Sequence, residues 1–399
     1  MLIKRKEFIQ AGSLATASIL LPRFLKAFEN KNAVPPGNKV VVVVQLSGGN
    51  DGLNTVIPFR DDLYYKARPQ LGIAASKVLQ LNDEAALHPA LNTFRQLYDE
   101  GSLGIINSVG YPNPDRSHFR SMDIWQSASS SDQYLHSGWA GRYLDAQCSQ
   151  CDKPTQAIEI DEVLSLALKG DIMNGLAVKD PKRLYGTSNE TFFKDIRASH
   201  EALHQESPAD YLYKTLAETL SSADYIFRQS RLHPSAAVYP ATGLGNSLRT
   251  IASLIFSDIN TKIYYVSLGS FDTHVSQDAQ QQRLFTEMDN AIAAFVNDLK
   301  ANHRFEDVLL FTFSEFGRRV AQNASNGTDH GTANNMFLVS GGLRRQGLIN
   351  PVCDLSDLQD GDLRFKVDFK EVYATVLNKW LDADDAAILG KKYTCMNFI

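Results

Sequence analysis

Five consecutive valines, Val40–Val44, are followed by Gln45, Leu46 and the turn sequence SGGNDG. A continuous β-branched run is typical of a strand buried on both faces, which is the environment of a central strand in a parallel sheet. The glycines, Asn50 and Asp51 then favour a turn at the carboxyl end of that strand. The run therefore predicts the middle of an α/β sheet and places an acid, Asp51, at the end of its central strand.

Four later segments repeat this pattern of an apolar strand that ends in a polar or glycine-rich turn. They are LGIINSVG from Leu103, KIYYVSLGSFDTH from Lys262, DVLLFTFSEFG from Asp307 and MFLVSGG from Met336. Helical patterns lie between them, at residues 90–98, 208–228, 246–256 and 281–300. This alternation predicts a single α/β domain over residues 39–399, with a mostly parallel central sheet covered by helices on both faces. Residues 150–205 are less regular, and we interpret them as a cap or insertion.

The first 27 residues have the pattern of a signal peptide. A basic start, Lys4–Lys6, precedes an apolar run, Ala11–Leu21, that is too short to span a bilayer. The segment RKEFIQ is twin-arginine-like, with Lys6 in place of the second arginine, and residues 28–38 form a linker. We therefore expect an exported protein, periplasmic or extracellular, without a transmembrane helix in the mature chain. The alternative is that the apolar run is a short buried helix.

Charge argues against a nucleic-acid partner. The net charge of the 399-residue chain is −5. Cleavage after residue 27 removes five basic residues and one acidic residue, so the mature chain would carry −9. An acidic protein has no electrostatic support for binding nucleic acid.

Acids and histidines collect at the predicted strand ends, where α/β sheets form their sites. The candidate metal ligands are Asp51, Asp272, His274, Glu315 and His330. Asp272 and His274 are two residues apart in an extended segment, so their side chains point the same way. Three carboxylates and two imidazoles suit a divalent metal such as zinc, manganese or magnesium. Ordinary turns and a helix cap at Asp272 are the alternative reading of these residues.

A second candidate segment is NPDRSHFRSMD, residues 113–123, which follows one strand and starts a helix. Ser117 is the preferred nucleophile there and Ser121 the second choice, while Arg116 and Arg120 would balance the charge of a phosphoryl or sulfuryl group. The alternative is an N-cap serine and two solvated helix charges. No Gly-x-Ser-x-Gly motif and no complete Gly-x-Gly-x-x-Gly motif is present.

Several of these segments, in this order, resemble the exported family called domain of unknown function 1501. They are VVVVQLSGGNDGLNTVIPF, YPNPDRSHFRSMDIWQS, GSFDTHVSQ, FSEFGRRV, NGTDHGTANNMF and DLRFKVDFKEVYATVLNKWL. That family is similar in its motifs to the alkaline phosphatase and sulfatase superfamily, which implies a three-layer α/β/α fold with a metal site at the strand ends.

The resemblance also implies roles for single residues. Asp51 would match the metal aspartate of the first strand, Asp272 and His274 an Asp/His ligand pair, Glu315 the acid of an Asp-His strand end, and His330 the final histidine ligand. Phe316 departs from the pattern, because the superfamily usually has a metal histidine at that position and phenylalanine cannot bind a metal.

Two hypotheses about function follow. The first is an exported metal-dependent hydrolase of phosphate or sulfate esters, acting on a small-molecule or polymer substrate. The second is an exported, non-catalytic binding or assembly protein that kept the fold and lost the chemistry, which Phe316 and the unsecured nucleophile favour.

Overall fold

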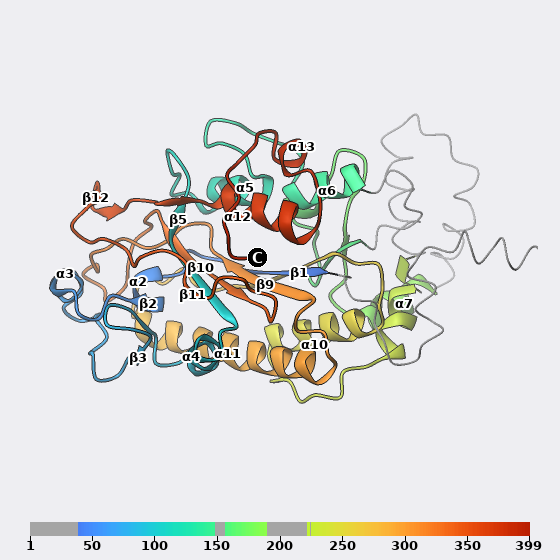
Figure 1. The fold of residues 1–399 in the computed structure, drawn as a ribbon, viewed down its shortest axis with the longest axis horizontal. Coiled ribbons are helices and arrows are strands. Elements are labelled where there is room, and N and C mark those ends of the chain that lie inside the picture. The colour runs from blue at the N-terminus through green and yellow to red at the C-terminus, as the bar shows by residue number, and fades with distance from the viewer. Residues whose placement is uncertain (1–38, 148–155, 190–221, 224) are drawn as a thin grey trace, which may run out of the picture. The chain divides into compact units, whose positions relative to one another are not determined.

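The valine run forms β1 (Val40–Leu46), and all seven residues of this strand are buried. β1 lies between two parallel neighbours, β8 (Ile263–Leu268) and β9 (Val308–Phe313). Within the described residues the sheet has nine strands in the order β11-β5-β10-β9-β1-β8-β6-β7, and β14 pairs with β5 (Figure 1). The run thus occupies the centre of the sheet, as its composition predicted.

The structure is a computed structural model that describes residues 39–147, 156–189, 222–223 and 225–399. The proposed signal peptide and linker, residues 1–38, and most of the expected helix 208–228 lie outside these ranges. Residues Lys39–Ile399 form one compact unit by their contacts.

The remaining strands of the main sheet include short ones at its edges. They are β5 (Leu103–Gly110), β6 (Ala157–Glu159), β7 (Leu176–Ala177), β10 (Asn334–Val339), β11 (Gly347–Leu348) and β14 (Val367–Asp368). Two small sheets pair β2 (Val56–Ile57) and β3 (Leu79–Gln80) with β4 (Ala86–Leu87), and β12 (Leu358–Gln359) with β13 (Asp362–Leu363). Within the stretch interpreted as a cap, β6 and β7 belong to the main sheet, where β6 pairs with β8.

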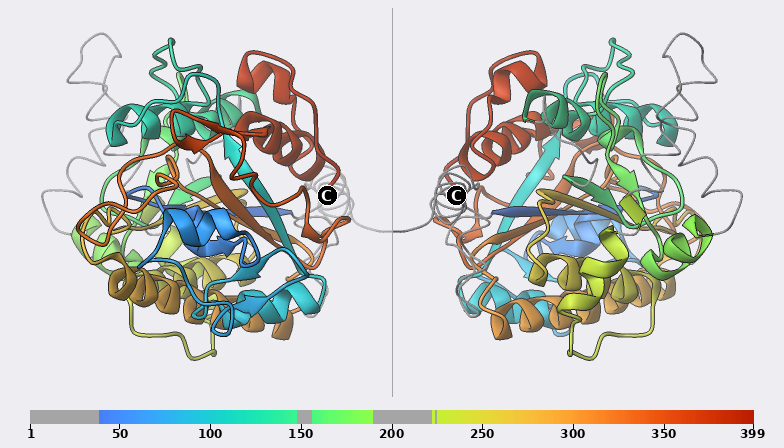
Figure 2. Two further views of the ribbon diagram at one scale, coloured as in Figure 1. Left: turned by 90° about the vertical axis from the view of Figure 1, so that its left-hand side faces the viewer. Right: turned by 90° about the vertical axis from the view of Figure 1, so that its right-hand side faces the viewer.

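Alternate valines of β1 face opposite layers of the molecule. Val40, Val42 and Val44 pack in one apolar cluster with α4 (Asn92–Asp99), α10 (Gly243–Phe256) and α11 (Gln277–Ala301). Val41 and Val43 pack in a second cluster with α5 (His118–Ser127), α6 (Trp139–Gln147), α12 (Phe369–Thr375) and α13 (Asp385–Leu389). Figure 1 and the side views of Figure 2 show these two helix layers with the sheet between them. The predicted three-layer α/β/α fold is confirmed.

The described chain also contains shorter helices. They are α2 (Gly52–Thr55), α3 (Asp62–Ala67), η2 (Leu166–Leu168), α7 (Pro181–Ser188) and a π-helical turn, η4 (Val376–Trp380), that continues α12.

β10 is the reversed strand of the main sheet. It pairs antiparallel with β5 and with β9, whereas the other paired strands of the sheet run parallel. β9 therefore ends, and β10 begins, at the same edge of the sheet. The connection between them, residues 314–333, stays at the edge where β1 and β8 also end.

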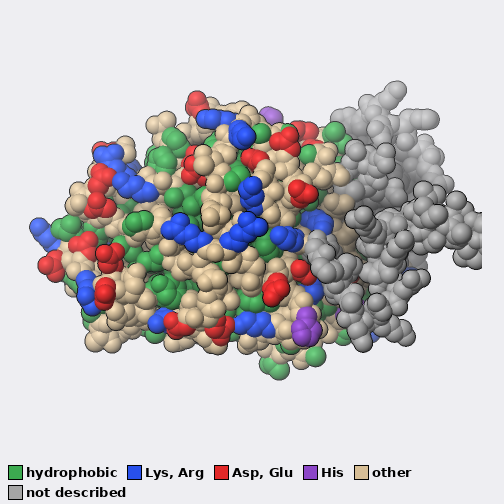
Figure 3. All heavy atoms as spheres, in the orientation of Figure 1, with side chains coloured by type: hydrophobic (Ala, Val, Ile, Leu, Met, Phe, Trp, Pro, Cys, Tyr) green, Lys and Arg blue, Asp and Glu red, His purple; other side chains and the backbone are tan. Residues whose placement is uncertain are grey.

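The surface view in Figure 3 shows acidic and basic side chains interspersed on one face. None of the described helices has both the length and the apolar character that crossing a membrane requires.

Candidate metal centre

Asp272 and His274 lie in the loop that follows β8. The His274 Nε2 atom is 2.9 Å from Asp272 Oδ1, so the two side chains meet as their spacing predicted. The loop packs closely on the turn after β1. Gly48 has a φ of +116°, and a Cβ atom on it would lie 2.5 Å from the Asp272 backbone nitrogen. Only glycine allows both this backbone angle and this approach.

His330 reaches the same point from the connection between β9 and β10. Hydrogen bonds close the base of that loop, from Gly317 N to Thr332 O and from Gly331 N to Gly317 O, each 2.8 Å long. The His330 Nε2 atom lies 3.3 Å from Asp272 Oδ1 and 3.0 Å from His274 Nε2. Burial lowers the pKa of His330.

His118, the first residue of α5, completes a cluster with Asp272, His274 and His330, although it is not among the ligands predicted from the sequence. Its Nε2 atom lies 3.5 Å from Asp272 Oδ2, and this nitrogen is buried without a hydrogen-bond partner. His118, Asp272 and His330 each offer a ligand atom within 4.8 Å of the others. A signal was available, because His118 follows the carboxyl end of β5 as Asp272 follows that of β8.

Glu315 lies behind His118. Its Oε1 atom contacts His118 Nδ1 at 2.9 Å and accepts from Gly48 N at 2.8 Å, and the carboxylate is 1% exposed. The hydrogen bond to Glu315 raises the pKa of His118. Glu315 was predicted as a metal ligand, but in the structure it contacts His118. It fixes the orientation of that ring, as the hydrogen-bond partner of a metal-binding histidine does.

Asp51 has a different environment. Its carboxylate is buried and forms a bidentate ion pair with Arg68, in which Nη2 donates to Oδ1 at 2.9 Å and Nη1 donates to Oδ2. Gln277 also donates to Oδ2, and Leu53 N donates to Oδ1 as the cap of α2. Among the described residues, the group of possible metal ligands that lie within 4.8 Å of one another does not include Asp51, and a buried guanidinium already binds both of its oxygens.

A second buried arginine, Arg318, holds Asp272 in place. Its Nη2 atom donates to Asp272 Oδ1 at 2.7 Å, and its Nε atom donates to Gly49 O at 2.6 Å. Burial opposes ionisation of Asp272, but the hydrogen bond and charge of Arg318 outweigh it and lower the pKa of Asp272 to about 2. Asp272 is therefore a carboxylate at neutral pH and can serve as an anionic ligand.

Ser117 and Ser121 have different surroundings. Ser117 is exposed at the N-cap position of α5, and its side chain makes no capping hydrogen bond. Ser121 is fully buried, where its hydroxyl bonds Tyr111 Oη and the backbone oxygen of Glu315. Of the two serines, Ser117 is the accessible one.

The two arginines of this segment bind protein groups. Arg116 forms an ion pair with the buried carboxylate of Asp362, while its side chain is 44% exposed and its carbonyl oxygen lies 2.8 Å from His330 Nδ1. Arg120 donates through Nη2 to three carbonyl oxygens, those of Ser130, Ser131 and Gln133. Arg116 therefore borders the cluster, whereas the hydrogen bonds of Arg120 lie in the loop after α5.

Phe316 forms an apolar floor beneath two of the histidines. Its ring centroid lies 4.9 Å from that of His118 and 4.7 Å from that of His330. The side chain is buried and cannot bind a metal. It therefore closes one side of the two histidine rings to any ligand.

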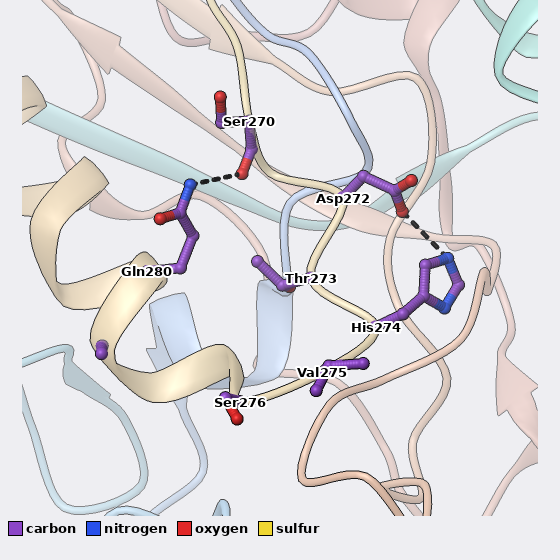
Figure 4. Close-up of a pocket in the computed structure, with 8 residues that line it drawn as sticks. Ser270, Asp272, Thr273, His274, Val275, Ser276 and Gln280 are labelled. Atoms are coloured by element: carbon purple, nitrogen blue, oxygen red, sulfur yellow. Dashed lines mark hydrogen bonds and ion pairs between the residues drawn. The ribbon is translucent and has the colours of Figure 1, made fainter.

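A cavity of about 550 Å³ opens beside Asp272 and His274 (Figure 4). Its other walls come from the loop after β8 and the first turn of α11, namely Ser270, Thr273, Val275, Ser276, Ala279 and Gln280. Hydroxyl and amide groups predominate among these side chains. The cluster thus has neighbouring space for a polar group.

The sequence matches the family model described as protein of unknown function (DUF1501) over residues 38–385. A comparison with curated proteins gave no significant match.

Solved structures similar to this chain include the zinc complex of the periplasmic domain of EptC from Escherichia coli. It is 10% identical with a TM-score of 0.36, and the match covers 78% of this chain and 76% of that one. The lipoteichoic acid synthase LtaP from Listeria monocytogenes is 12% identical with a TM-score of 0.35, covering 91% and 76%. A protein of the alkaline phosphatase superfamily from Vibrio parahaemolyticus is 8% identical with a TM-score of 0.39, covering 91% and 74%.

Proposed function

The chain belongs to the DUF1501 family, and from that premise we propose that it is an exported, metal-dependent hydrolase of phosphate or sulfate esters. The observation that supports this most strongly is the meeting of His118, Asp272 and His330 around the buried, unpartnered Nε2 atom of His118. Two imidazole nitrogens and an ionised carboxylate form a donor set that fits zinc or manganese.

Each residue of the site would have a separate role in ester hydrolysis. His118, Asp272 and His330 would hold the ion, and Glu315 keeps the ring of His118 oriented through Nδ1. A bound ion would polarise the ester oxygen and stabilise the charge that develops on it. Ser117, exposed and next to His118 in the chain, would supply the attacking hydroxyl. Its oxygen would bond to phosphorus or sulfur as the bond to the alcohol oxygen breaks, the hydroxyl proton would end on the released alcohol, and water would then free the phosphate or sulfate from the serine. Arg116 balances the charge of the phosphoryl or sulfuryl group through the exposed part of its guanidinium.

Aryl phosphate and aryl sulfate hydrolysis, measured beside the metal content, tests this function. We expect wild-type protein to hold metal and to release the aryl alcohol from at least one of the two substrates. Asp272→Asn should lose metal and activity together, and Ser117→Ala should lose activity while keeping metal. Ser76→Ala, at an exposed serine elsewhere on the surface, is the matched control and should behave as wild type. Metal-free wild-type protein that hydrolyses neither ester would contradict the proposal.

The second candidate is an exported, non-catalytic binding or assembly protein. The observation that favours it is that Arg116 and Arg120 are both engaged by protein groups, an acid and three carbonyl oxygens. Bound metal together with no hydrolysis of either ester would support this candidate over the hydrolase.

Export forms part of the same proposal. Cleavage within residues 1–38 and recovery from the periplasmic or external fraction are the expected outcome. The measurement is the intact mass of the protein from each fraction. An uncleaved chain that remains in the cytoplasmic fraction would contradict export.

A further inference from the structure

A second cavity, of about 550 Å³, lies apart from the candidate metal centre. It shares no lining residue with that centre or with the cavity beside Asp272. Its walls come from the start of α7, from the helical residues 225–232 and from α10. None of the residues that line it has a part in the proposed ester hydrolysis, so this cavity needs an explanation of its own.

The three helices around this second cavity are joined by contacts between them. The rings of Tyr185, on α7, and Phe227 stack with their centroids 4.3 Å apart. The hydroxyl of Ser257, at the end of α10, donates to the Gln229 carbonyl oxygen at 2.5 Å. Residues 225–232 are therefore tied to both neighbouring helices, and the cavity walls are in place without a ligand.

The charge of the lining is positive. Lys182, Arg231 and Arg249 are exposed and line the cavity, and within the described parts of the chain none of them forms an ion pair. The acid of the lining, Asp180, caps α7, where its Oδ1 atom accepts from Lys182 N at 2.8 Å and from Arg183 N at 3.2 Å. Three positive charges thus face one negative charge, in a chain whose net charge is −5.

Helical spacing brings the donors of the cavity together. Asn246 and Arg249 are three positions apart on α10 and lie on one face, and both line the cavity. Arg231 is four positions after Phe227, and its Cζ atom lies 5.5 Å from the centroid of that ring. Guanidinium groups donate several hydrogen bonds in one plane, which matches the oxygens of phosphate and sulfate. Positive groups gathered in one hollow repel one another, and a bound anion offsets that repulsion.

We propose that this second cavity is a binding site for a phosphate or sulfate group, held by Arg231, Arg249 and Lys182. Small-molecule sites in proteins are typically about 300–1,000 Å³ in volume, so the cavity has room for a free ion or for a small ester that carries one. The inference goes beyond the proposed function and does not depend on it, because the anion is bound here and undergoes no reaction.

Calorimetric titration of the full chain, first dialysed against a chelator, tests the inference. The dialysis removes metal, so that no anion binds through an ion at the candidate metal centre. The probes are sodium phosphate, sodium sulfate and glycerol phosphate, with sodium chloride at the same ionic strength as the reference. We expect saturable binding of one phosphate or sulfate group per chain. Tighter binding of glycerol phosphate than of phosphate would identify an ester as the ligand, and equal binding would identify the free ion.

Single substitutions assign the site. Arg231→Gln and Arg249→Gln should each weaken anion binding at least fivefold, because each removes a charged donor. Arg283→Gln, at an exposed arginine of α11 outside the cavity, is the matched control and should leave binding unchanged. Asp180→Asn should instead tighten binding, because it removes the opposing charge while asparagine still caps α7. Circular dichroism of each variant checks that the fold is kept.

Three results would overturn the inference: no saturable binding, the same response to chloride at matched ionic strength, or unchanged affinity in both arginine variants. The second of these would mean that the basic side chains are only screened by salt. Loss of anion binding in His274→Ala would place the anion at the candidate metal centre and would overturn the inference as well. Ester hydrolysis is not a readout of these titrations, so their result and the fate of the hydrolase proposal are separate.

Discussion

Asp51 and Asp272 both follow buried strands, yet their neighbours give them different environments. The Asp51 carboxylate is buried and accepts hydrogen bonds from Arg68 and Gln277. The Asp272 carboxylate is 47% exposed and faces three histidines. The sequence places both acids at strand ends but contains no sign that Arg68, in the cap after α3, reaches back to Asp51. Side-chain pairing across loops is the part of the site that periodicity cannot predict.

The role of Asp51 can be tested by Asp51→Asn. Breaking a buried ion pair by neutralising one partner costs about 3–5 kcal/mol, so we expect a large loss of stability in urea unfolding. Zinc bound per folded chain should stay the same, because Arg68 and not the ion is the partner of Asp51. Asp61→Asn is the control, since Asp61 caps α3 through Leu63 N in an exposed position and asparagine caps equally well. Loss of zinc from folded Asp51→Asn would restore Asp51 as a ligand.

His88 gives the molecule an acid-sensitive residue outside the cluster. Its Nδ1 atom accepts from Ala90 N at 3.1 Å and its ring packs on Phe285, and burial lowers the pKa of His88 to about 4. The unfolded chain, with a histidine pKa near 6.5, binds more protons between these two values. Stability from His88 is therefore complete above pH 6.5 and is lost as the pH falls toward 4.

We expect His88→Gln to reduce the loss of stability between pH 7 and pH 4.5 by roughly 2–3 kcal/mol, because this interval covers most of the difference between the two pKa values at about 1.4 kcal/mol per unit. Urea unfolding at pH 7 and pH 4.5 measures it, with His303→Gln, at an exposed histidine, as the control. An unchanged pH dependence in His88→Gln would show that other groups cause the acid sensitivity.

Among the site residues, Asp272, His274 and His330 could be selected from the sequence because strand ends and a glycine-flanked loop mark them. The sequence does not single out His118, because the serines and arginines beside it suggest a different chemistry for its segment. Arg318 cannot be predicted either, because a basic residue after a strand carries no sign of burial, although here it is 2% exposed.

At the scale of elements, the turn after β1 is as important to the cluster as the ligands. Gly48 has a φ of +116°, and its carbonyl accepts from Arg318 while its amide donates to Glu315. We expect Gly48→Ala to weaken zinc binding at least tenfold and to destabilise the fold by about 1–3 kcal/mol, because the new methyl group would displace the Asp272 backbone.

Gly269→Ala is the matched control for that turn. A Cβ atom on Gly269 has open space within 4 Å, and the residue lies in the loop that carries Asp272. Zinc affinity should be unchanged in this variant. An equal loss of zinc affinity in the two variants would mean that alanine disturbs the site from either segment, and that the close approach of Gly48 to Asp272 is not the cause.

Strand positions were predictable because continuous β-branched and aromatic runs are distinctive, and the strands expected from residues 40, 103, 262, 307 and 336 are all present. The direction of β10 was not, because a strand buried on both faces has the same composition in either direction. Its reversal lets His330, which precedes the strand, meet residues that follow β8.

At the scale of the whole molecule, the metal should stabilise the fold. The candidate ligands come from the segment after β5, the loop after β8 and the loop before β10, and these lie together only in the folded chain. Zinc at a thousandfold excess over its Kd should add about 4 kcal/mol to the free energy of unfolding. Thermal melts with zinc and with a chelator measure this increment, and His330→Ala should lack it. Identical melts of wild-type protein in the two conditions would contradict zinc binding to the native state.

Arg318 also bears on how the chain folds. It donates to Gly49 across 269 positions of sequence and to Phe271 across 47, and the buried guanidinium has these acceptors only when the turn after β1 and the loop after β8 are both in place. Contacts of such long range form late and slow the search for the native state. The centre should therefore acquire metal affinity in the last cooperative step of folding, so that the appearance of zinc binding during refolding would time the completion of the whole sheet.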